Sequence, residues 1–409
     1  SDLLGADMAN KDLKWETTIT RNIGVDFGFF NSRLTGTIDA YWNTTKDLLM
    51  KTAIPGITGF TSTYANVGQT SNKGIEIALQ GVLVKTRDWN VTAGFNINFN
   101  RGKVDKLADN VTGLYGTEWA TSSTFPKSDY VLKEGRPVGL VRGLTADGFY
   151  TTDDFTYANG VYTLKEGVAD VSSAVFPNYH LHNGMNERPA GQLAYPGMAK
   201  FKDLNDDGII NDDDVDVIGD MTPVHTGGFN INATYKNFDL GLYFNWSYGN
   251  EIYNVNKLAA LYGYKEGAVY ENKLSIVKDC YKIYDVVNGE LVALTTPEQL
   301  NAANANAKLP LAYSENGYVS TLGIEDGSYL RLNTLTLGYT LPKSMLQKAG
   351  ISNLRVYGSI YNVFTITGYS GIDAEVSTST STKTYPQLGM DWGTYPRARS
   401  FVLGVNLSF

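Results

Sequence analysis

The sequence predicts an all-β protein, a transmembrane antiparallel β-barrel with long extracellular loops, and three observations carry this prediction. Apolar and polar residues alternate strictly in nine segments, which gives each strand one apolar and one wetter face. The connections between these segments are alternately short and long. The chain also ends on such a segment, from Ser400 to Phe409, with no polar tail after the final aromatic residue.

The last segment shows why a membrane is the better explanation of the alternation. Its apolar face carries Phe401, Leu403, Val405, Leu407 and Phe409. A soluble protein rarely ends on a bare apolar strand, because an open edge and an apolar face invite aggregation. A barrel closed in a membrane accommodates both faces and both edges. The alternative for this segment alone is an inner strand of a soluble sandwich.

The clearest alternation lies between Trp89 and Asn100, where aromatic and aliphatic residues alternate with polar ones. The polar face includes Asn90, Asn96, Asn98 and Asn100, a poor core but a suitable wall for a water-filled lumen. The other predicted strands cover residues 15–29, 34–42, 75–83, 229–235, 238–246, 335–341, 354–364 and 400–409. A phase slip near Asn333 predicts a β-bulge.

The connections separate into two classes by their order in the chain. The short ones are 30–33, 85–88, 236–237 and 342–352, and the long ones are 45–72, 101–226, 249–327 and 366–397. Outer-membrane barrels have short periplasmic turns and long outer loops, whereas a soluble sandwich has no reason to separate its loops in this way. Aromatic residues also gather at both ends of the strands, as in the interfacial girdles of a barrel.

Two shorter elements are predicted inside the connections. Thr296 precedes Pro297 and an alanine-rich stretch, which predicts a capped helix from Pro297 to Lys308. The connection from Pro342 to Ser352 is compact and is predicted to be helical.

Composition excludes several classes of protein. The chain has 409 residues, a net charge of −8 and one cysteine. The negative charge argues against a nucleic-acid partner, and one cysteine forms no disulfide within the chain. No apolar run approaches the roughly 20 residues that a membrane helix needs.

Nine strands is an odd number, whereas single-chain bacterial barrels are usually even. The polar start also lacks the basic and apolar regions of a signal peptide. The sequence therefore predicts the C-terminal part of a larger barrel, with its other strands in another segment or chain.

Several short motifs along the chain resemble those of one transporter family. They are Leu13-Lys14-Trp15-Glu16, the strand Asn22–Phe27, Lys46-Asp47-Leu48-Leu49, Asn66-Val67-Gly68, Asn72-Lys73-Gly74, Phe201-Lys202-Asp203-Leu204-Asn205, Gly227-Gly228-Phe229, Phe238-Asp239-Leu240 and Tyr395-Pro396. Taken together, they resemble the C-terminal part of the SusC/RagA family of TonB-dependent outer-membrane transporters of Bacteroidetes.

The resemblance implies a barrel of about 22 strands with a plugged lumen, of which this chain would supply about nine. It also implies localisation in the bacterial outer membrane, a SusD-like lipoprotein partner over the mouth, and energy from TonB through an N-terminal region. The plug domain and that region are absent from this chain. The implied function is active import of a nutrient oligomer, either an oligosaccharide or an oligopeptide, without enzymatic activity.

One motif carries chemistry of its own. Residues 203–214 fit a calcium-binding loop, with predicted ligands at Asp203, Asn205, Asp207, Ile209 (through its carbonyl), Asn211 and Asp214. Gly208 occupies the position of the sharp turn, but the last ligand is Asp rather than the usual Glu. We expect Ca²⁺, if bound, to be structural and to brace an extracellular loop. The alternative is a surface turn without an ion.

Other candidate sites are weaker. His180 and His182 form a His-x-His pair, which is short of the ligands that zinc needs and equally fits solvated loop histidines. Cys280 has no evident base partner, and no catalytic motif is present. The sequence therefore leaves two classes of function, nutrient import and an enzyme or adhesin built on a barrel. It does not separate a glycan from a peptide as the substrate.

Overall fold

The nine alternating segments form one antiparallel sheet in the computed structural model, which describes residues 5–53, 60–107, 113–120, 124–176, 188–261, 273–312, 317–346, 350–378 and 387–409. The strand order is β2-β3-β6-β7-β19-β20-β26-β27-β29, so each strand pairs with the next alternating segment along the chain. The bounds are β2 (Thr17–Phe29), β3 (Leu34–Lys46), β6 (Gln69–Lys85), β7 (Trp89–Lys106), β19 (His225–Tyr235), β20 (Phe238–Tyr248), β26 (Tyr329–Thr340), β27 (Asn353–Thr367) and β29 (Ser400–Ser408). The predicted number and order of the main strands are confirmed.

Several strands are longer than the alternation predicted. β6 begins at Gln69 and β7 continues to Lys106, and the two pair along this length with two register shifts. The alternation of apolar and polar residues stops before these two strands end. Backbone pairing continues beyond the alternating residues and satisfies the N–H and C=O groups there. The bulge near Asn333 is confirmed, because the pairing of β26 with β27 shifts between Leu332 and Thr334.

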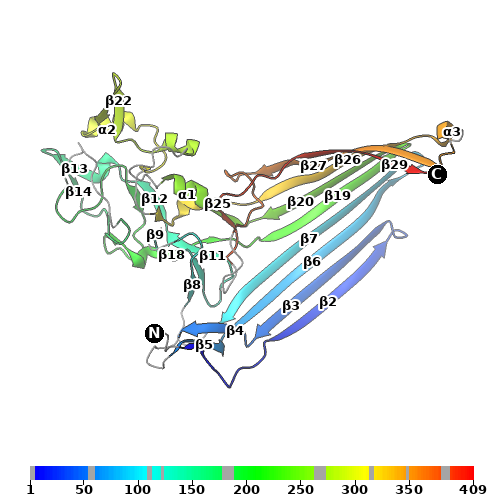
Figure 1. Cartoon of the computed structure of the whole chain (residues 1–409), viewed down its shortest axis with the longest axis horizontal. Helices are drawn as coiled ribbons and strands as arrows, with labels where there is room; N and C mark the ends of the chain where they lie inside the picture. Colours follow the sequence, from blue (N-terminus) through cyan, green and yellow to red (C-terminus); the bar gives the residue numbers. More distant parts are fainter. Residues whose placement is uncertain are drawn as a thin grey trace.

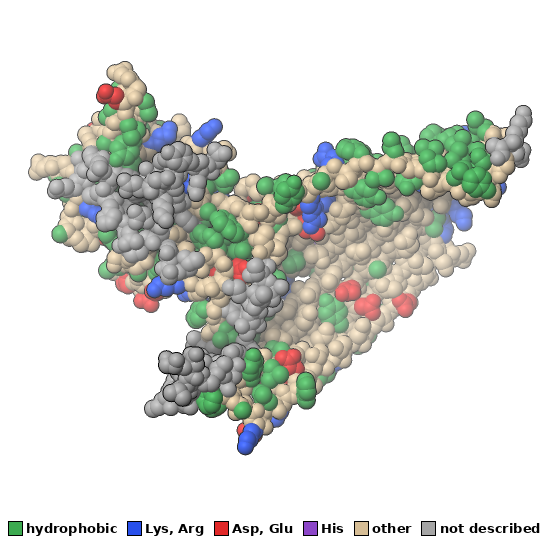
Figure 2. All heavy atoms as spheres, in the orientation of Figure 1, with side chains coloured by type: hydrophobic (Ala, Val, Ile, Leu, Met, Phe, Trp, Pro, Cys, Tyr) green, Lys and Arg blue, Asp and Glu red, His purple; other side chains and the backbone are tan. Residues whose placement is uncertain are grey.

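The two faces of the sheet differ in chemistry. Leu403, Phe401 and Ile23 are 88%, 72% and 63% exposed on the apolar face. No second sheet or helix layer covers these side chains within the described part of the chain, which excludes the inner strand of a soluble sandwich. The opposite face is polar and hollowed, and Figure 2 shows acidic side chains on it. An apolar face left bare in this way fits lipid outside and water inside.

Some positions on these faces are kept small by a neighbouring side chain. A Cβ added to Gly404 of β29 would lie 2.3 Å from the ring of Tyr357 on β27, and one added to Gly74 of β6 would lie 2.4 Å from the Tyr41 hydroxyl on β3. The tyrosine rings therefore lie flat over the neighbouring strand and cover its backbone on the luminal face.

The two ends of the sheet are also distinct (Figure 1). The short turns, the helix α3 (Lys343–Leu346) and the C-terminus lie at one end. The predicted helical connector is thus confirmed, although its helix is only four residues long. The long connections gather at the opposite end, which we call the mouth.

The excursions after β7 and β20 fold together at the mouth into a structure that we call the loop module. Its strands and helices are β8 (Leu114–Gly116), β9 (Thr124–Phe125), β10 (Tyr130–Leu132), β11 (Leu140–Leu144), β12 (Ala146–Phe149), η2 (Thr152–Asp154), β13 (Phe155–Ala158), β14 (Val161–Leu164), β15 (Asp170–Val171), β16 (Ala199–Phe201), β17 (Ile209–Ile210), η3 (Asp212–Asp214), β18 (Val215–Asp220), β21 (Glu251–Asn254), α1 (Val255–Leu261), η4 (Ser275–Asp279), β22 (Tyr284–Val287), β23 (Glu290–Ala293), α2 (Pro297–Ala303), β24 (Gly317–Tyr318), η5 (Thr321–Gly323) and β25 (Ile324–Asp326).

One hydrophobic core joins the two excursions of the loop module. It includes Tyr150, Tyr162 and Tyr195 from the first excursion and Tyr253 and Leu258 from the second. All five side chains are fully buried. β28 (Met390–Asp391), from the last excursion, pairs with β21. A separate small sheet at the mouth contains β1 (Gly5–Met8), β4 (Leu49–Ala53) and β5 (Phe60–Asn66). The long connections are therefore packed structures rather than independent loops.

The predicted helix is present as α2, with Thr296 at its N-cap. The Thr296 side chain accepts a hydrogen bond from the Gln299 N–H, and the Gln299 side chain accepts one from the Thr296 N–H at 3.1 Å, which is a capping box. The helix ends at Ala303 rather than Lys308, where the Asn304 side chain donates to the Leu300 carbonyl at 2.9 Å. None of the described helices is long and apolar enough to cross a membrane.

Candidate functional site: the luminal wall and its mouth

The luminal wall is lined by amide and hydroxyl side chains that bond to one another along the sheet. Tyr41 on β3 donates to Asn100 on β7 at 3.1 Å, and Tyr243 on β20 donates to Asn232 on β19 at 3.2 Å. Asn232 also donates to Asn230 at 3.1 Å. The asparagine face predicted from the sequence thus forms part of a hydrogen-bonded, water-compatible wall.

The same wall carries negative charge near β2, β3 and β6. Asp39 and Glu76 lie directly opposite each other in the pairing of β3 with β6. Neither has an ion-pair partner among the residues that the structure describes. Like charges opposite each other repel, so this part of the wall presents a negative potential to whatever occupies the lumen.

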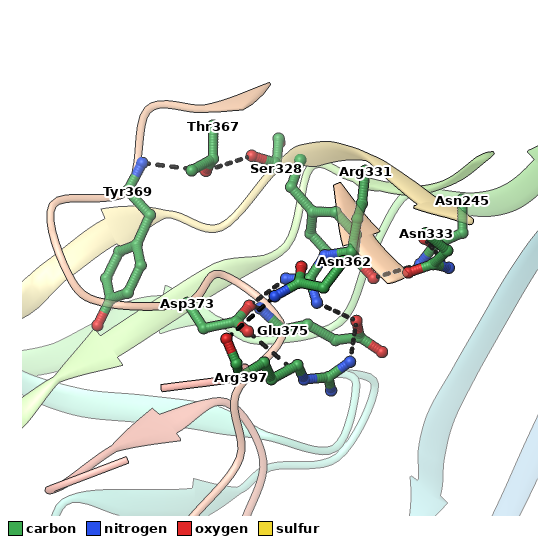
Figure 3. A network of polar contacts seen from close by, with 11 residues as sticks. Asn245, Ser328, Arg331, Asn333, Asn362, Thr367, Tyr369, Asp373, Glu375 and Arg397 are labelled. Carbon is green, nitrogen blue, oxygen red and sulfur yellow. Dashed lines mark hydrogen bonds and ion pairs between the residues drawn. The ribbon is translucent and has the colours of Figure 1, made fainter. Parts of the chain in front are cut away.

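Two arginines meet two carboxylates where the wall joins the mouth (Figure 3). Arg331 of β26 forms ion pairs with Asp373 and, at 3.4 Å, with Glu375. Arg397, just before β29, reaches Glu375 at 3.0 Å and Asp373 at 3.4 Å. The Arg331 side chain is only 2% exposed. The network therefore attaches the excursion between β27 and β29 to the luminal face of the sheet.

The same excursion, which we call the strap (residues 368–397), is also attached to the loop module. The Glu325 carboxylate accepts hydrogen bonds from the N–H and the hydroxyl of Ser370, both at 2.9 Å, and lies 3.2 Å from the Lys257 ammonium. Burial alone would raise the pKa of Glu325, but the Ser370 hydrogen bonds and Lys257 outweigh it and hold that pKa below its usual value.

A buried hydrogen bond also joins two parts of the strap to each other. The Tyr369 hydroxyl donates to the Asp391 carboxylate at 2.6 Å, and Asp391 is 2% exposed. Burial and the Asp391 charge raise the pKa of Tyr369. Sequence reasoning missed the residues of the strap contacts, because partners such as Arg331 and Asp373 are 42 positions apart and lie in no motif.

The six predicted calcium ligands lie together in the loop between β16 and β18, but their side chains bond mainly to the loop's own backbone. Asp203 accepts from the Gly208 N–H at 2.7 Å, and Asp207 accepts from the Ile209 N–H at 2.9 Å. Asn205 and Asn211 accept from backbone amides two residues further along.

The last predicted ligand, Asp214, is completely buried and has a structural role. It accepts hydrogen bonds from the Leu204 N–H at 2.7 Å and the Asn211 N–H at 2.8 Å, and so joins the two ends of the loop. Among the described residues, no group of three or more His, Cys, Asp or Glu side chains is placed to hold a metal ion. Calcium binding by this loop stays a prediction.

The remaining candidates have little support as sites. Cys280 is buried, and burial with the nearby Asp279 charge raises its pKa to about 11, so it is a thiol at neutral pH. His225 accepts a hydrogen bond from the Trp246 indole at 3.0 Å. His180 and His182 lie outside the described residues.

Comparison with known proteins agrees with this geometry. Residues 3–185 match the model of the family described as "TonB dependent receptor-like, beta-barrel". The chain is 30% identical over 408 residues to TonB-dependent receptor P3 of Formosa agariphila, covering 98% of this chain and 35% of that protein. It is 29% identical to TonB-dependent receptor SusC of Bacteroides thetaiotaomicron, covering 98% of this chain and 32% of that protein.

Solved structures show the same fold. The RagAB peptide importer in its closed-closed state superposes with a TM-score of 0.68 at 25% identity, covering 98% of this chain and 36% of that one. The RagAB peptide transporter gives a TM-score of 0.67 at 24% identity over 98% of this chain and 36% of that one. The chain thus spans about a third of the length of the relatives it matches.

The two-faced sheet and these similarities define an outer-membrane β-barrel protein, of which this chain forms nine strands. More narrowly, the chain is similar to TonB-dependent receptors, SusC among them, and to the RagAB peptide importer.

Proposed function

We propose that the whole protein imports nutrient oligomers, oligosaccharides or oligopeptides, across the outer membrane with energy from TonB. The observation that carries this proposal is the sheet with an exposed apolar face on one side and a hydrogen-bonded polar wall on the other. Such a wall lets hydrated solutes pass, because the Asn and Tyr side chains replace some of their water contacts. The similarity to SusC and to the RagAB peptide importer supports the same function.

The partners in this proposal are a SusD-like lipoprotein at the mouth, TonB, and the remaining barrel and plug supplied by the rest of the protein. The excursions 45–72, 101–226, 249–327 and 366–397 lie outside the cell in this arrangement, and the loop module is the surface on which the lipoprotein sits. The loop 203–214 holds Ca²⁺ as a structural brace. These assignments are supported by the family resemblance and by the position of the loop module at one end of the sheet.

An enzyme or adhesin built on the barrel is the other class of function. The similarities favour transport, because the named relatives are receptors and importers. Cys280, the one cysteine of the chain, is buried in the loop module and is not exposed as a nucleophile at the mouth.

Deletion of the gene for the whole protein tests the proposal. The deletion strain should lose growth on the cognate oligomer as the sole nutrient source, keep growth on the corresponding monomer, and recover when the gene is restored. A strain lacking TonB should show the same loss. Normal uptake of oligopeptides and oligosaccharides by the deletion strain would count against import.

A further inference from the structure

A row of four side chains crosses the mouth ends of β2, β3, β6 and β7, which are neighbours in the sheet (Figure 1). Arg21 lies directly opposite Trp42, and Trp42 lies directly opposite Lys73. Lys73 in turn lies directly opposite Arg101. Residues that are paired in this way point to the same face of the sheet. The four side chains therefore lie together, and we call them the cation row.

The cation row lies on the apolar face of the sheet, at the boundary between apolar and polar residues. The adjoining row on the side of the short turns is apolar throughout and contains Ile23, Ala40, Ile75 and Phe99. The adjoining row on the mouth side is mostly polar and contains Ile19, Thr44, Ser71 and Lys103. Such a boundary is expected where the hydrocarbon of a membrane gives way to the headgroups, and Trp42 fits the aromatic girdle there.

The length of β2 supports this position. Arg21 lies eight residues before Phe29, which is at the short-turn end of the same strand and on the same face. At about 3.3 Å per residue and a tilt of about 40°, this spacing corresponds to about 20 Å across the membrane. The apolar band of such barrels is about 25 Å tall. Arg21 is therefore near the far edge of the band, where its long side chain reaches the headgroups.

Two positive charges of the cation row face each other without compensation. Lys73 and Arg101 are directly opposite, and like charges in this arrangement repel. Neither of them, nor Arg21, forms an ion pair with a carboxylate in the described part of the chain, and all three are exposed. Lys103 differs, because its ammonium lies 3.1 Å from the Asp105 carboxylate. An anion between Lys73 and Arg101 would replace their repulsion by two attractions.

We propose that the cation row binds the phosphate of a lipid headgroup, which lies between Lys73 and Arg101. Both side chain types bind phosphate through charge-assisted hydrogen bonds. Arg101 uses one N–H group for the Pro223 carbonyl at 2.8 Å, and a guanidinium has five. The acyl chains of the lipid cover Ile75 and Phe99 in the adjoining apolar row. A free phosphate ion has no apolar part to place there, so the surroundings favour a lipid.

The other two members of the cation row extend this surface. Arg21 lies two strands from Lys73, about 10 Å away, and its charge adds to the attraction at this range. Trp42 lies between them and packs against the same lipid at the level of the headgroups. In the orientation proposed above, the lipid belongs to the outer leaflet. The inference goes beyond the import function, because it is independent of the imported substrate.

The test uses the full-length protein purified in a neutral detergent. Native mass spectrometry compares the binding of dioleoyl phosphatidic acid with that of dioleoylglycerol, which has the same acyl chains but no phosphate. We expect phosphatidic acid to bind at least about 10-fold tighter, because each nearby cation contributes about 5-fold to the affinity for an anionic lipid. A large excess of inorganic phosphate should not displace the lipid, because the ion lacks the acyl chains.

A double variant removes the two charges that face each other. Lys73→Gln together with Arg101→Gln should lower the affinity for phosphatidic acid by about 25-fold and leave that for dioleoylglycerol unchanged. Lys282→Gln together with Lys308→Gln is the matched control, since both lysines are exposed in the loop module. It removes the same net charge from the protein and should leave both affinities unchanged.

A single variant tests the inference without altering the pair of β6 with β7. Arg21→Gln should lower the affinity for phosphatidic acid by about 5-fold. Equal affinity for the two lipids, or a preference for phosphatidic acid that the double Gln variant keeps, would overturn the inference. Displacement by inorganic phosphate would show an ion site instead of a lipid site. Loss of the preference in the loop-module control would show that net charge alone governs binding, and both results would also overturn it.

Discussion

Arg331 on the wall of the sheet and Asp373 in the strap form a buried ion pair, with side chains 2% and 7% exposed. Glu375 and Arg397 complete the network, so two positive charges meet two negative charges. Charges are rarely buried unless they are paired. The Arg331–Asp373 pair therefore holds the strap against the luminal face of the sheet only while both residues are present.

Arg331→Met should destabilise the protein by about 3–5 kcal/mol, because it leaves the buried Asp373 carboxylate without its main partner. The free energy of unfolding in urea, measured in detergent micelles, checks this value. Arg397→Met is the matched control and should have an effect below about 1 kcal/mol, since the Arg397 side chain is 48% exposed. Equal effects of the two substitutions would contradict this account of the network.

The attachment of the strap to the loop module should weaken in acid. The pKa of Glu325 is held below its usual value in the folded protein, so its charge stabilises the fold above the unfolded pKa of about 4.3. That contribution is lost as the pH falls through the lower folded pKa. We expect limited proteolysis to cut the strap faster at pH 3.5 or so than at pH 7.

Glu325→Gln should remove most of this pH dependence, because the amide does not titrate and still accepts a hydrogen bond from Ser370. Glu290→Gln provides the control, since Glu290 is an exposed residue of β23. If the wild-type protein and Glu325→Gln lose protection over the same pH range, another group is responsible.

The assignment of the two faces predicts opposite results at neighbouring positions of β29. Leu403 is 88% exposed on the apolar face, whereas Val402 lies opposite Ser359 on the luminal face. Leu403→Arg should destabilise the barrel by up to about 2–4 kcal/mol, depending on its depth in the bilayer. Val402→Arg should have an effect below about 1 kcal/mol, because an arginine there reaches water. Refolding into lipid vesicles with urea titration gives both values, and a larger loss for Val402→Arg would refute the assignment.

The calcium prediction is tested by the ligand positions of the loop. If the loop binds Ca²⁺, free calcium at 100 times Kd should raise the free energy of unfolding by about 2.7 kcal/mol. Asp207→Asn should reduce this gain, because it removes a carboxylate at a ligand position. Asp213→Asn removes the same charge at a position outside the ligand pattern and should keep the gain. No response of the wild-type protein to calcium or to its chelation would reject the site.

The sequence by itself determined the nine strands of the main sheet, their faces and their order. Period-two alternation in segments such as 89–100 depends only on which side of a strand faces the apolar medium. It can therefore be recognised from consecutive residues without knowledge of the tertiary structure. The Thr296 cap and the bulge near Asn333 were also predictable, because each depends on residues a few positions apart.

Only the tertiary structure decided how the mouth is built. The shared core of the loop module joins Tyr150 to Tyr253, and the strap network joins Arg331 to Asp373, across distances in sequence that no periodic pattern spans. A pocket at the mouth likewise combines Leu49 of β4, Asn72 of β6 and Leu132 of β10. Side chains in irregular connections do not alternate between two faces. Their contact partners therefore depend on the folded positions of the backbone and not on spacing along the chain.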